Sequence, residues 1–288
     1  MPSLRDRCYL STMNRIFVTG GASGLGRAIA EAYARRTFHV CIGDVNDARG
    51  EEAREALLRA GAASAIYVRC DVTREEDLVA VRERLEKPLA EGGFGGVDIV
   101  VNNAGVAQAG AIDEVSLDDW RWVVDINLLG VVRGCKVFTP LFKQQKKGHF
   151  VNVASMAGLL DVPCMAAYNA TKAAVVSLSE TLDNELFDDG IGVTLVCPSF
   201  FKTNLAESLR TPDPRLKVTV DKLLARSSIT ADDIAEDIVR AVEKKTFYLL
   251  PHKDGRLAWT LKRTLPRRAY SAILRKQTEK MRPRRAAS

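Results

Sequence analysis

The sequence has no long apolar run. Its apolar stretches are of strand length, and one of them, residues 97–101, is interrupted by Asp98. A helix that spans a bilayer needs about 20 consecutive apolar residues, so no transmembrane helix is expected. The first twelve residues contain charged side chains and no apolar core, which argues against a secretory signal. Because Met13 directly precedes the first predicted strand, residues 1–13 are interpreted as an N-terminal extension or as sequence before an alternative start.

Patterns typical of disulfide frameworks and metal sites are also missing. The six cysteines form no Cys-x-x-Cys pair. Cys41, Cys70 and Cys197 fall in predicted buried strands, where a reduced thiol acts as a small apolar group. The three histidines stand singly beside predicted strands, without the spacing of metal ligands. We therefore expect no metal site and a reducing, cytoplasmic setting.

The chain shows no internal repeats and no linker-like stretch before residue 200, and 47% of its 288 residues are hydrophobic. One large α/β domain is therefore the better interpretation, over residues 14–254. Apolar segments of strand length alternate with helical segments, which is typical of a parallel sheet with covered faces. We predict a doubly wound parallel sheet, a Rossmann fold, of about seven strands with helices on both faces.

The predicted elements follow from this alternation. Strands are expected near residues 15–19, 38–43, 65–70, 97–101, 149–153, 191–196 and 247–250. Helices are expected near residues 24–36, 47–60, 74–90, 117–146, 166–188 and 231–244. Residues 204–229, which include two prolines, are expected to form a mobile lid.

A glycine-rich loop joins the first predicted strand to the first predicted helix. Its sequence is Gly20-Gly21-Ala22-Ser23-Gly24-Leu25-Gly26. Glycines let the backbone approach a pyrophosphate closely, and the free N–H groups and dipole of a helix N-terminus face its charge. A strand before the loop and a helix after it are the context that this motif requires. The expected contacts to the phosphates are Gly20, Ser23, Gly24, Leu25 and Gly26.

Tyr168 and Lys172 are four residues apart in a predicted helix, with Ser155 thirteen residues before the tyrosine. Four residues apart, a phenol and an ammonium lie on one helix face, with Cβ atoms about 5–6 Å apart. Lowering the phenol pKa by about 3 units from about 10 requires about 4 kcal/mol. A cation about 4 Å away supplies that energy at an effective dielectric constant near 20. An isolated tyrosine and lysine at this spacing are usually solvated neighbours on a helix. The glycine-rich loop is the observation that favours a catalytic role for this pair.

Together these motifs resemble the short-chain dehydrogenase/reductase family in its single-domain form. The resemblance extends from about Asn14 to about Leu250. The motifs occur in the family's order: Thr19 to Gly26, Asp71-Val72, Asn102-Asn103-Ala104-Gly105, Asn127, Ser155, Tyr168, Lys172, Pro198 and Thr203. The resemblance implies an enzyme that interconverts an alcohol and a carbonyl compound by hydride transfer with a nicotinamide cofactor.

The resemblance also implies roles for the matched residues. Tyr168 would exchange the proton of the substrate hydroxyl, a role that works best with a pKa near the ambient pH. Lys172 would lower that pKa and bind the nicotinamide ribose, and Ser155 would donate a hydrogen bond to the substrate oxygen. Asn127 would hold a water that links the lysine to solvent, although an asparagine in a helix can also be a packing residue.

Further cofactor contacts follow from the same resemblance. Thr203 should contact the nicotinamide amide, and Asp71 should bind the adenine amino group. The remaining expected contacts are Val72, Asn103, Ala104, Gly105 and Pro198. One position departs from the family pattern: Ser199 follows Pro198 where glycine is usual, so a tighter backbone is expected there.

Asp44 argues for NAD as the cofactor. It closes the second predicted strand, eighteen residues after Gly26. A carboxylate there accepts hydrogen bonds from the ribose hydroxyls and repels a 2′-phosphate. No arginine stands next to it, and Ser23 occupies a loop position where NADP-using relatives often carry a basic residue. We therefore predict NAD rather than NADP. The alternative is that Asp44 only caps the following turn.

The residues expected around the substrate are apolar, which favours a hydrophobic secondary alcohol or ketone over a small polyol. They are Met156, Leu159, Leu160, Val162, Met165, Phe200, Phe201, Leu205 and Leu209. Cys164 is expected at the pocket edge or as a packed thiol.

The C-terminal tail, residues 255–288, has 11 lysines and arginines and one acidic residue, which leaves 31 basic and 35 acidic residues in the rest of the chain. Residues 256–264 and 267–281 are predicted amphipathic helices. A solvated tail or a subunit contact is the favoured interpretation. Peripheral binding to an anionic membrane surface, which such segments can provide, is the first alternative, and nucleic-acid binding is the less favoured one.

Three classes of function remain open from the sequence. The first is an NAD-dependent dehydrogenase or carbonyl reductase, forming the homodimer or homotetramer that is usual in the family. The second is a non-catalytic NAD-binding sensor or scaffold, and Ser155, Tyr168 and Lys172 argue against it. The third is an interaction protein that uses its basic tail at a membrane or, less favoured, on nucleic acid.

Overall fold

The computed structural model describes residues 13–203, 207–225 and 227–279. Its centre is a sheet of seven parallel strands in the order β3-β2-β1-β4-β5-β6-β7. The strands are β1 (Arg15–Thr19), β2 (His39–Asp44), β3 (Ser64–Arg69), β4 (Ile99–Asn102), β5 (Gly148–Val153), β6 (Ile191–Val196) and β7 (Tyr248–Leu249). The predicted doubly wound fold is confirmed, and each strand overlaps its predicted segment.

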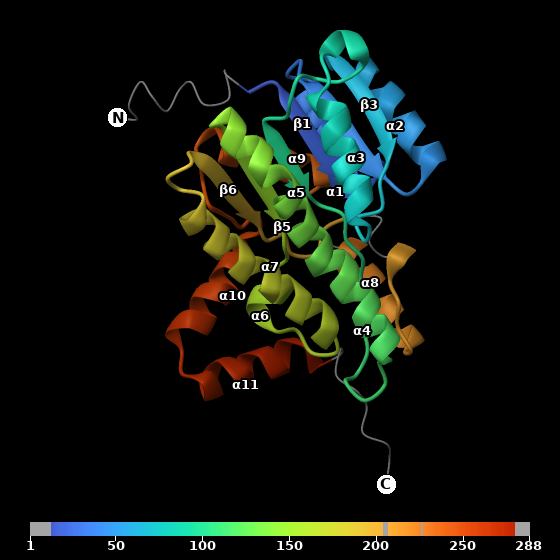
Figure 1. Cartoon of the computed structure of the whole chain (residues 1–288). Helices are drawn as coiled ribbons and strands as arrows, with labels where there is room; N and C mark the ends of the chain where they lie inside the picture. Colours follow the sequence, from blue (N-terminus) through green and yellow to red (C-terminus); the bar gives the residue numbers. More distant parts are fainter. Residues whose placement is uncertain (1–12, 204–206, 226, 280–288) are drawn as a thin grey trace.

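Helices cover both faces of this sheet (Figure 1). They are α1 (Gly24–Ala34), α2 (Asp47–Arg59), α3 (Glu75–Glu86), α4 (Leu117–Val124), α5 (Gly130–Gln145), α6 (Ala157–Leu160), α7 (Ala166–Glu185), α8 (Pro214–Ala225), α9 (Ala231–Glu243), α10 (Lys253–Thr264) and α11 (Arg267–Gln277). A short 3-10 helix, η3 (Leu89–Glu91), follows α3.

Three helical segments differ from the prediction. The single helix expected over residues 117–146 is divided into α4 and α5 by a π-helical turn, η4 (Asp125–Leu129). The expected lid contains the twelve-residue helix α8, whose period the sequence analysis did not recognise behind two prolines. Residues 157–160, for which no helix was predicted, form the single turn α6.

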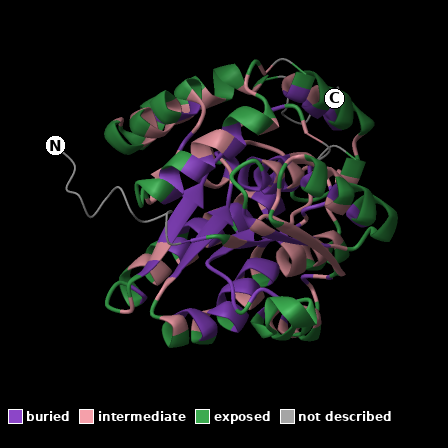
Figure 2. Ribbon diagram, turned by 90° about the horizontal axis from the view of Figure 1, so that it is seen from above, coloured by how far each residue is buried: buried purple, intermediate pink, exposed green. Residues whose placement is uncertain are grey.

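Two apolar clusters hold the layers together, and alternate residues of the strands belong to opposite clusters. Ile16 and Val18 of β1 pack with α1, α2 and α9, whereas Phe17 packs with α3, α5 and α7. Figure 2 shows the consequence: buried residues fill the sheet and the inner sides of the helices, and exposed residues lie on the outer sides. A sheet with both faces covered explains why the strands are almost continuously apolar.

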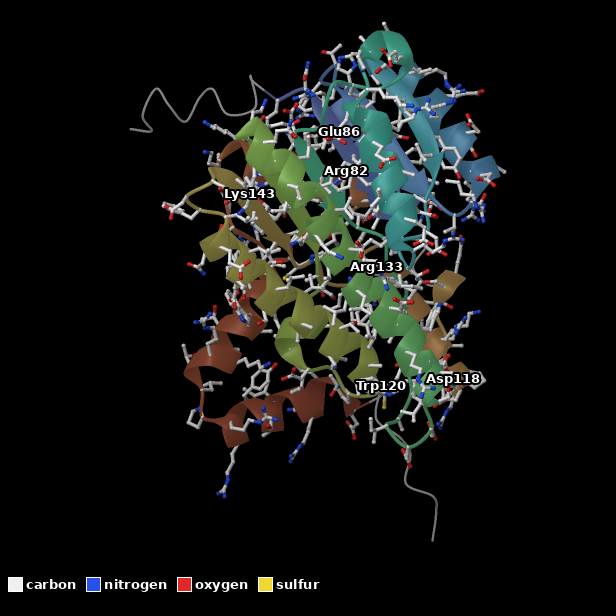
Figure 3. All side chains as sticks on the ribbon, viewed as in Figure 1. Arg82, Glu86, Asp118, Trp120, Arg133 and Lys143 are labelled. Carbon is white, nitrogen blue, oxygen red and sulfur yellow. The ribbon has the colours of Figure 1, made fainter. Side chains whose placement is uncertain are left out.

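The front face of the molecule carries α3, α4 and α5, with charged side chains on the outside (Figure 3). Arg133 on α5 reaches inward instead. Its guanidinium binds the carboxylate of Asp125 at 2.7 Å and the carbonyl oxygen of Val72 at 3.1 Å. This contact ties the π-helical turn to the loop that follows β3, at the edge of the sheet where the strands end.

The strand order reverses between the neighbouring strands β1 and β4. In a doubly wound sheet, the crevice beyond the carboxyl ends of the strands at this point is the usual ligand site. Thr19, Asn102 and Val153 end β1, β4 and β5 there. No helix among the described residues is long and apolar enough to cross a bilayer.

Candidate active site

A cavity of about 470 Å³ opens at this edge of the sheet. Fifteen of the residues predicted to bind cofactor or substrate atoms line it: Gly20, Ser23, Gly24, Leu25, Asp44, Asp71, Val72, Asn103, Ala104, Gly105, Ser155, Tyr168, Lys172, Pro198 and Thr203. Gly26 and Asn127 lie behind the lining. The cavity therefore brings together predicted residues that are up to 183 positions apart in the sequence, Gly20 and Thr203.

The glycine loop is shaped by close packing. A Cβ atom on Gly26 would lie 2.1 Å from the carbonyl oxygen of Gly20, so only glycine fits there. Gly20 and Gly24 have φ angles of 63° and 53°, in the left-handed region that glycine adopts without strain. The side-chain amide of Asn103 donates to the carbonyl oxygen of Thr19 at 2.9 Å and holds the loop against β4.

The N-terminus of α1 has no side-chain cap, a feature that it shares with α3, α7, α10 and α11. The side chains of Asn46, Ser116 and Thr230 cap α2, α4 and α9, whereas Ser23 makes no such bond at α1. The first turn of α1 also has no acidic residue, and Gly24 and Leu25 face the cavity. Uncapped N–H groups and the positive end of a helix dipole bind anions, so this cradle fits a dinucleotide pyrophosphate.

Asp44 lies at the rim of the same cavity. Its carboxylate accepts hydrogen bonds from the backbone N–H groups of Ala22 and Asn46, both at 3.1 Å. The two interpretations of Asp44 are therefore compatible: it caps the turn after β2, and it also faces the cavity. In the loop after β3, the carboxylate of Asp71 accepts hydrogen bonds from the backbone N–H and the hydroxyl of Thr73 at 2.9 Å and 2.7 Å.

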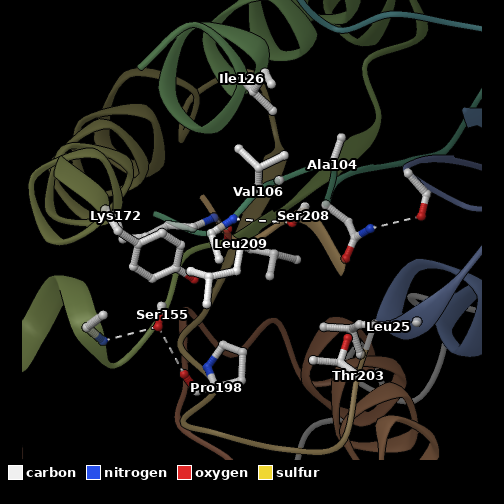
Figure 4. A pocket seen from close by; sticks show the side chains of 18 of the residues that line it. Leu25, Ala104, Val106, Ile126, Ser155, Lys172, Pro198, Thr203, Ser208 and Leu209 are labelled. Atoms are coloured by element: carbon white, nitrogen blue, oxygen red, sulfur yellow. Dashed lines mark hydrogen bonds between the residues drawn. The ribbon is translucent and has the colours of Figure 1, made fainter. Parts of the chain in front are cut away.

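Tyr168 on α7 and Ser155 after β5 meet at the other end of the cavity, and Figure 4 shows Ser155 there with Lys172 and Pro198. Burial raises the pKa of Tyr168 to about 12, and a hydrogen bond with Ser155 opposes the rise. The hydroxyl of Ser155 accepts a hydrogen bond from the N–H of Ala157 at 3.1 Å and donates to the carbonyl oxygen of Pro198 at 3.4 Å. These bonds fix the serine hydroxyl beside the phenol.

Burial sets the direction of the Tyr168 pKa in this structure, and the lowering expected from Lys172 stays a prediction. The ammonium of Lys172 lies 5.9 Å from the centroid of the phenol ring and donates to the carbonyl oxygen of Val153 at 2.9 Å. Burial also lowers the pKa of Lys172 itself, to about 8. The desolvation of both side chains therefore outweighs the attraction that their spacing suggested.

Asn127 is buried in the π-helical turn η4, behind the cavity wall. Its side-chain amide donates to the carbonyl oxygen of Val106 at 2.9 Å and accepts from the N–H of Val106 at 2.8 Å. Both ends of the amide thus hold the loop that follows β4. The water-binding role predicted for Asn127 stays a prediction.

The substrate end of the cavity is apolar, as predicted. Of the nine residues expected there, the lining includes Met156, Leu160, Val162, Met165, Phe200, Phe201 and Leu209. Leu159 instead packs in the core between the sheet and α7, and Leu205 lies outside the described residues. Ser199 does not adopt a positive φ, so the departure from glycine at this position causes no backbone strain.

Sequence analysis missed two charged residues of the cavity, Arg49 and Glu207. Their side chains form an ion pair at 3.0 Å between α2 and the segment before α8. Arg49 lies five residues after Asp44, beyond the adjacent positions in which an arginine was expected to matter. Glu207 carries no motif, so only the tertiary structure places it here.

Comparison with known proteins now decides the family. The family model for the short chain dehydrogenases matches residues 14–214. This chain belongs to the short-chain dehydrogenase/reductase family. A CLA biosynthesis dehydrogenase/reductase from Lactiplantibacillus plantarum is 33% identical over 258 residues, covering 83% of this chain and 88% of that protein. The 3beta-hydroxysteroid dehydrogenase 1 of Eggerthella lenta is 33% identical over 223 residues, covering 76% and 83%.

Solved structures agree with this assignment. A short-chain dehydrogenase/reductase from Burkholderia phymatum in complex with NAD has a TM-score of 0.80 and 31% identity, covering 95% of this chain and 99% of that one. An alcohol dehydrogenase from Thermococcus sibiricus complexed with 5-hydroxy-NADP has a TM-score of 0.68 and 27% identity, covering 83% and 95%. This short-chain dehydrogenase/reductase is thus an oxidoreductase for CH–OH groups with a nicotinamide cofactor, and these relatives leave the choice of NAD or NADP open.

Proposed function

We propose that this protein interconverts a hydrophobic secondary alcohol and its ketone with NAD. The observation that carries the proposal is one cavity with an uncapped helix N-terminus at one end and the Tyr168 and Ser155 hydroxyls at the other, beside an apolar wall. The steroid-class relative supports a hydrophobic alcohol. A non-catalytic NAD sensor is the second candidate, and the buried tyrosine, serine and lysine on one cavity argue against it.

Ser155 and Tyr168 both act on the substrate oxygen in this mechanism. The bound nicotinamide supplies or accepts the hydride. Ser155 donates a hydrogen bond to the oxygen as its charge changes, which stabilises the transition state. A phenol with a pKa of about 12 is protonated near neutral pH, so Tyr168 is ready to protonate the oxygen during ketone reduction. In alcohol oxidation Tyr168 first releases its own proton to solvent, and the proton of the substrate hydroxyl then moves to the Tyr168 oxygen.

Lys172 and the cradle residues act on binding and orientation. The ammonium of Lys172 is held by the carbonyl oxygen of Val153 at the floor of the cavity and would bind the hydroxyls of the nicotinamide ribose. The free N–H groups at the start of α1 would bind the pyrophosphate. The carboxylate of Asp44 favours an unmodified adenosine ribose over one with a 2′-phosphate, which is the basis for choosing NAD.

The decisive test compares the wild type with the variant Tyr168→Phe. We expect the wild type to turn over members of a panel of hydrophobic secondary alcohols and ketones with NAD or NADH, and the variant to lose activity by about 10²-fold or more, the usual effect of removing a general acid or base. NADH binding, measured by fluorescence titration, should be kept in both proteins. NADH binding without turnover in the wild type would instead support the sensor.

Two further proposals concern partners. Assembly as a homodimer or homotetramer stays a proposal from the family. So does peripheral contact with an anionic membrane through the basic tail. The two predicted tail helices are present as α10 and α11, and exposed basic side chains on them surround the exposed Leu257 and Ile273.

A further inference from the structure

The C-terminal helices α10 and α11 pack against the wall of the substrate end of the cavity. In Figure 1 α10 lies beside α6 and α11 lies below it, at the opposite end of the molecule from β3. Gly255 at the start of α10 packs on Met156, since a Cβ atom on this glycine would lie 3.1 Å from the Met156 Cγ. Met156 lines the cavity next to Ser155. The contact therefore connects the tail to the first residue after the serine.

The segment that separates the tail from the cavity is a single helical turn with open carbonyl groups. Helix α6 has four residues and ends at Asp161, which has a φ of 58°. One turn of helix leaves its last carbonyl groups without partners in the same helix, and so short a helix is unstable alone. Leu160 and Val162 of this segment line the cavity. The positions of Leu160 and Val162 therefore depend on the donors that bind the carbonyl groups of residues 159–162.

Side chains from the tail supply those partners. The ammonium of Lys262 donates to the carbonyl oxygen of Leu159 and to the carboxylate of Asp161, both at 2.6 Å. The buried Tyr270 donates its hydroxyl to the carbonyl oxygen of Leu160 at 3.1 Å. From the other side, Asn169 on α7 donates to the carbonyl oxygen of Val162 at 2.7 Å. The cavity wall is thus held between the tail and the helix that carries Tyr168.

We propose that Lys262 is a positioning residue for the substrate wall, with Tyr270 as its second support. It acts through residues 157–162 and touches neither substrate nor cofactor. The proposal rests on the proposed function in one respect, that a substrate binds against this wall. It follows that the tail selects among substrates by size, because a bulky alcohol contacts Leu160 and Val162 and a small one does not.

The test uses the full chain with Lys262→Met and Tyr270→Phe, and Lys276→Met as the matched control. Lys276 is an exposed lysine on α11, so its variant loses the same charge without the contact. We expect Lys262→Met to raise the KM for a bulky secondary alcohol by about 5- to 10-fold, the effect of one lost hydrogen bond. The kcat, the KM for a small secondary alcohol and the Kd for NADH should stay within about twofold. Lys262→Arg should restore much of the loss.

A second measurement does not depend on activity. Amide hydrogen exchange in residues 157–165 should become faster in Lys262→Met and Tyr270→Phe than in Lys276→Met. Equal exchange in all three variants, or faster exchange with an unchanged KM for the bulky alcohol, would overturn the proposal. If the wild type turned over no alcohol, the proposed function would fail, and the exchange measurement would still decide whether Lys262 positions the wall. Tyr270→Phe keeps its ring packing, so it serves if Lys262→Met does not fold.

Discussion

Asp44 makes two kinds of contact at the scale of a single residue. Its carboxylate is held by the N–H groups of Ala22 and Asn46, and it also lies on the cavity. The nearest candidate for an opposing charge on the lining is Arg49, which is paired with Glu207. The choice between NAD and NADP at this rim therefore depends on two groups. One is the Asp44 carboxylate, which backbone N–H groups hold in place, and the other is the Arg49 guanidinium, which is already paired with a carboxylate.

Replacing Asp44 by asparagine should weaken the preference for NAD. The amide keeps the size of the side chain but no longer repels a 2′-phosphate. We expect the ratio of kcat/KM with NAD to kcat/KM with NADP to fall by about 10-fold or more, the effect of about 1.4 kcal/mol. Steady-state kinetics with both cofactors measure it, with Glu51→Gln on the exposed side of α2 as the control. An unchanged ratio in Asp44→Asn would contradict the assignment of NAD to this carboxylate.

At the scale of elements, α9 is the helix whose start is most firmly defined. Thr230 and Asp233 form a reciprocal capping box, with the threonine hydroxyl accepting from the Asp233 N–H at 3.1 Å and the carboxylate accepting from the Thr230 N–H at 2.9 Å. Its apolar side packs on α1 and the sheet through Ile234, Ile238 and Val242. The cap thus stabilises the layer behind the glycine loop, away from the cavity.

Thr230→Ala should lower stability without changing the chemistry. Loss of an N-cap hydroxyl costs about 1 kcal/mol, up to about 2. Urea denaturation should show a lower midpoint with an unchanged slope, while KM and kcat at a temperature well below the transition stay at wild-type values. Thr260→Ala, which removes an exposed hydroxyl inside α10, serves as the control. A fall in activity at full folding would show that α9 acts on the site.

At the scale of the whole molecule, histidines that lose contact with water on folding make stability depend on pH. Burial lowers the pKa of His149 to about 3, and it also lowers the pKa of His39 and of His252. In the unfolded chain a histidine has a pKa of about 6.5. Between these values the unfolded state binds a proton that the folded state does not, so the free energy of unfolding falls as the pH falls.

For His149 alone, this loss should approach about 1.4 kcal/mol per pH unit below about pH 6.5. The ring bonds the hydroxyl of Thr194 at 2.8 Å in the core. His149→Gln keeps a polar group there but does not titrate, so its unfolding free energy should depend less steeply on pH between about 6 and 4.5. Denaturation curves at several pH values provide the comparison. Parallel pH dependence in the two proteins would show that His149 is protonated without cost.

The alternation of apolar and helical segments was enough to predict where the strands and the covering helices lie along the chain. The hydrophobic period of a strand or a helix is a local property of the sequence. The glycine loop, Ser155, Tyr168 and Lys172 were predicted for the same reason: each is a short motif with its own chemistry. The pairing of Arg49 with Glu207, by contrast, joins residues with no common motif.

The electrostatics of the site depended on the tertiary structure. Spacing on a helix suggested that Lys172 lowers the pKa of Tyr168, but burial of both side chains raised one pKa and lowered the other. Burial is a property of everything packed around a residue, so no local pattern contains it. The same reason applies to the tail. Its positive charge was evident from the sequence, but its contacts with the cavity wall were not. Only folding showed that Lys262 reaches back 101 residues to hold Asp161.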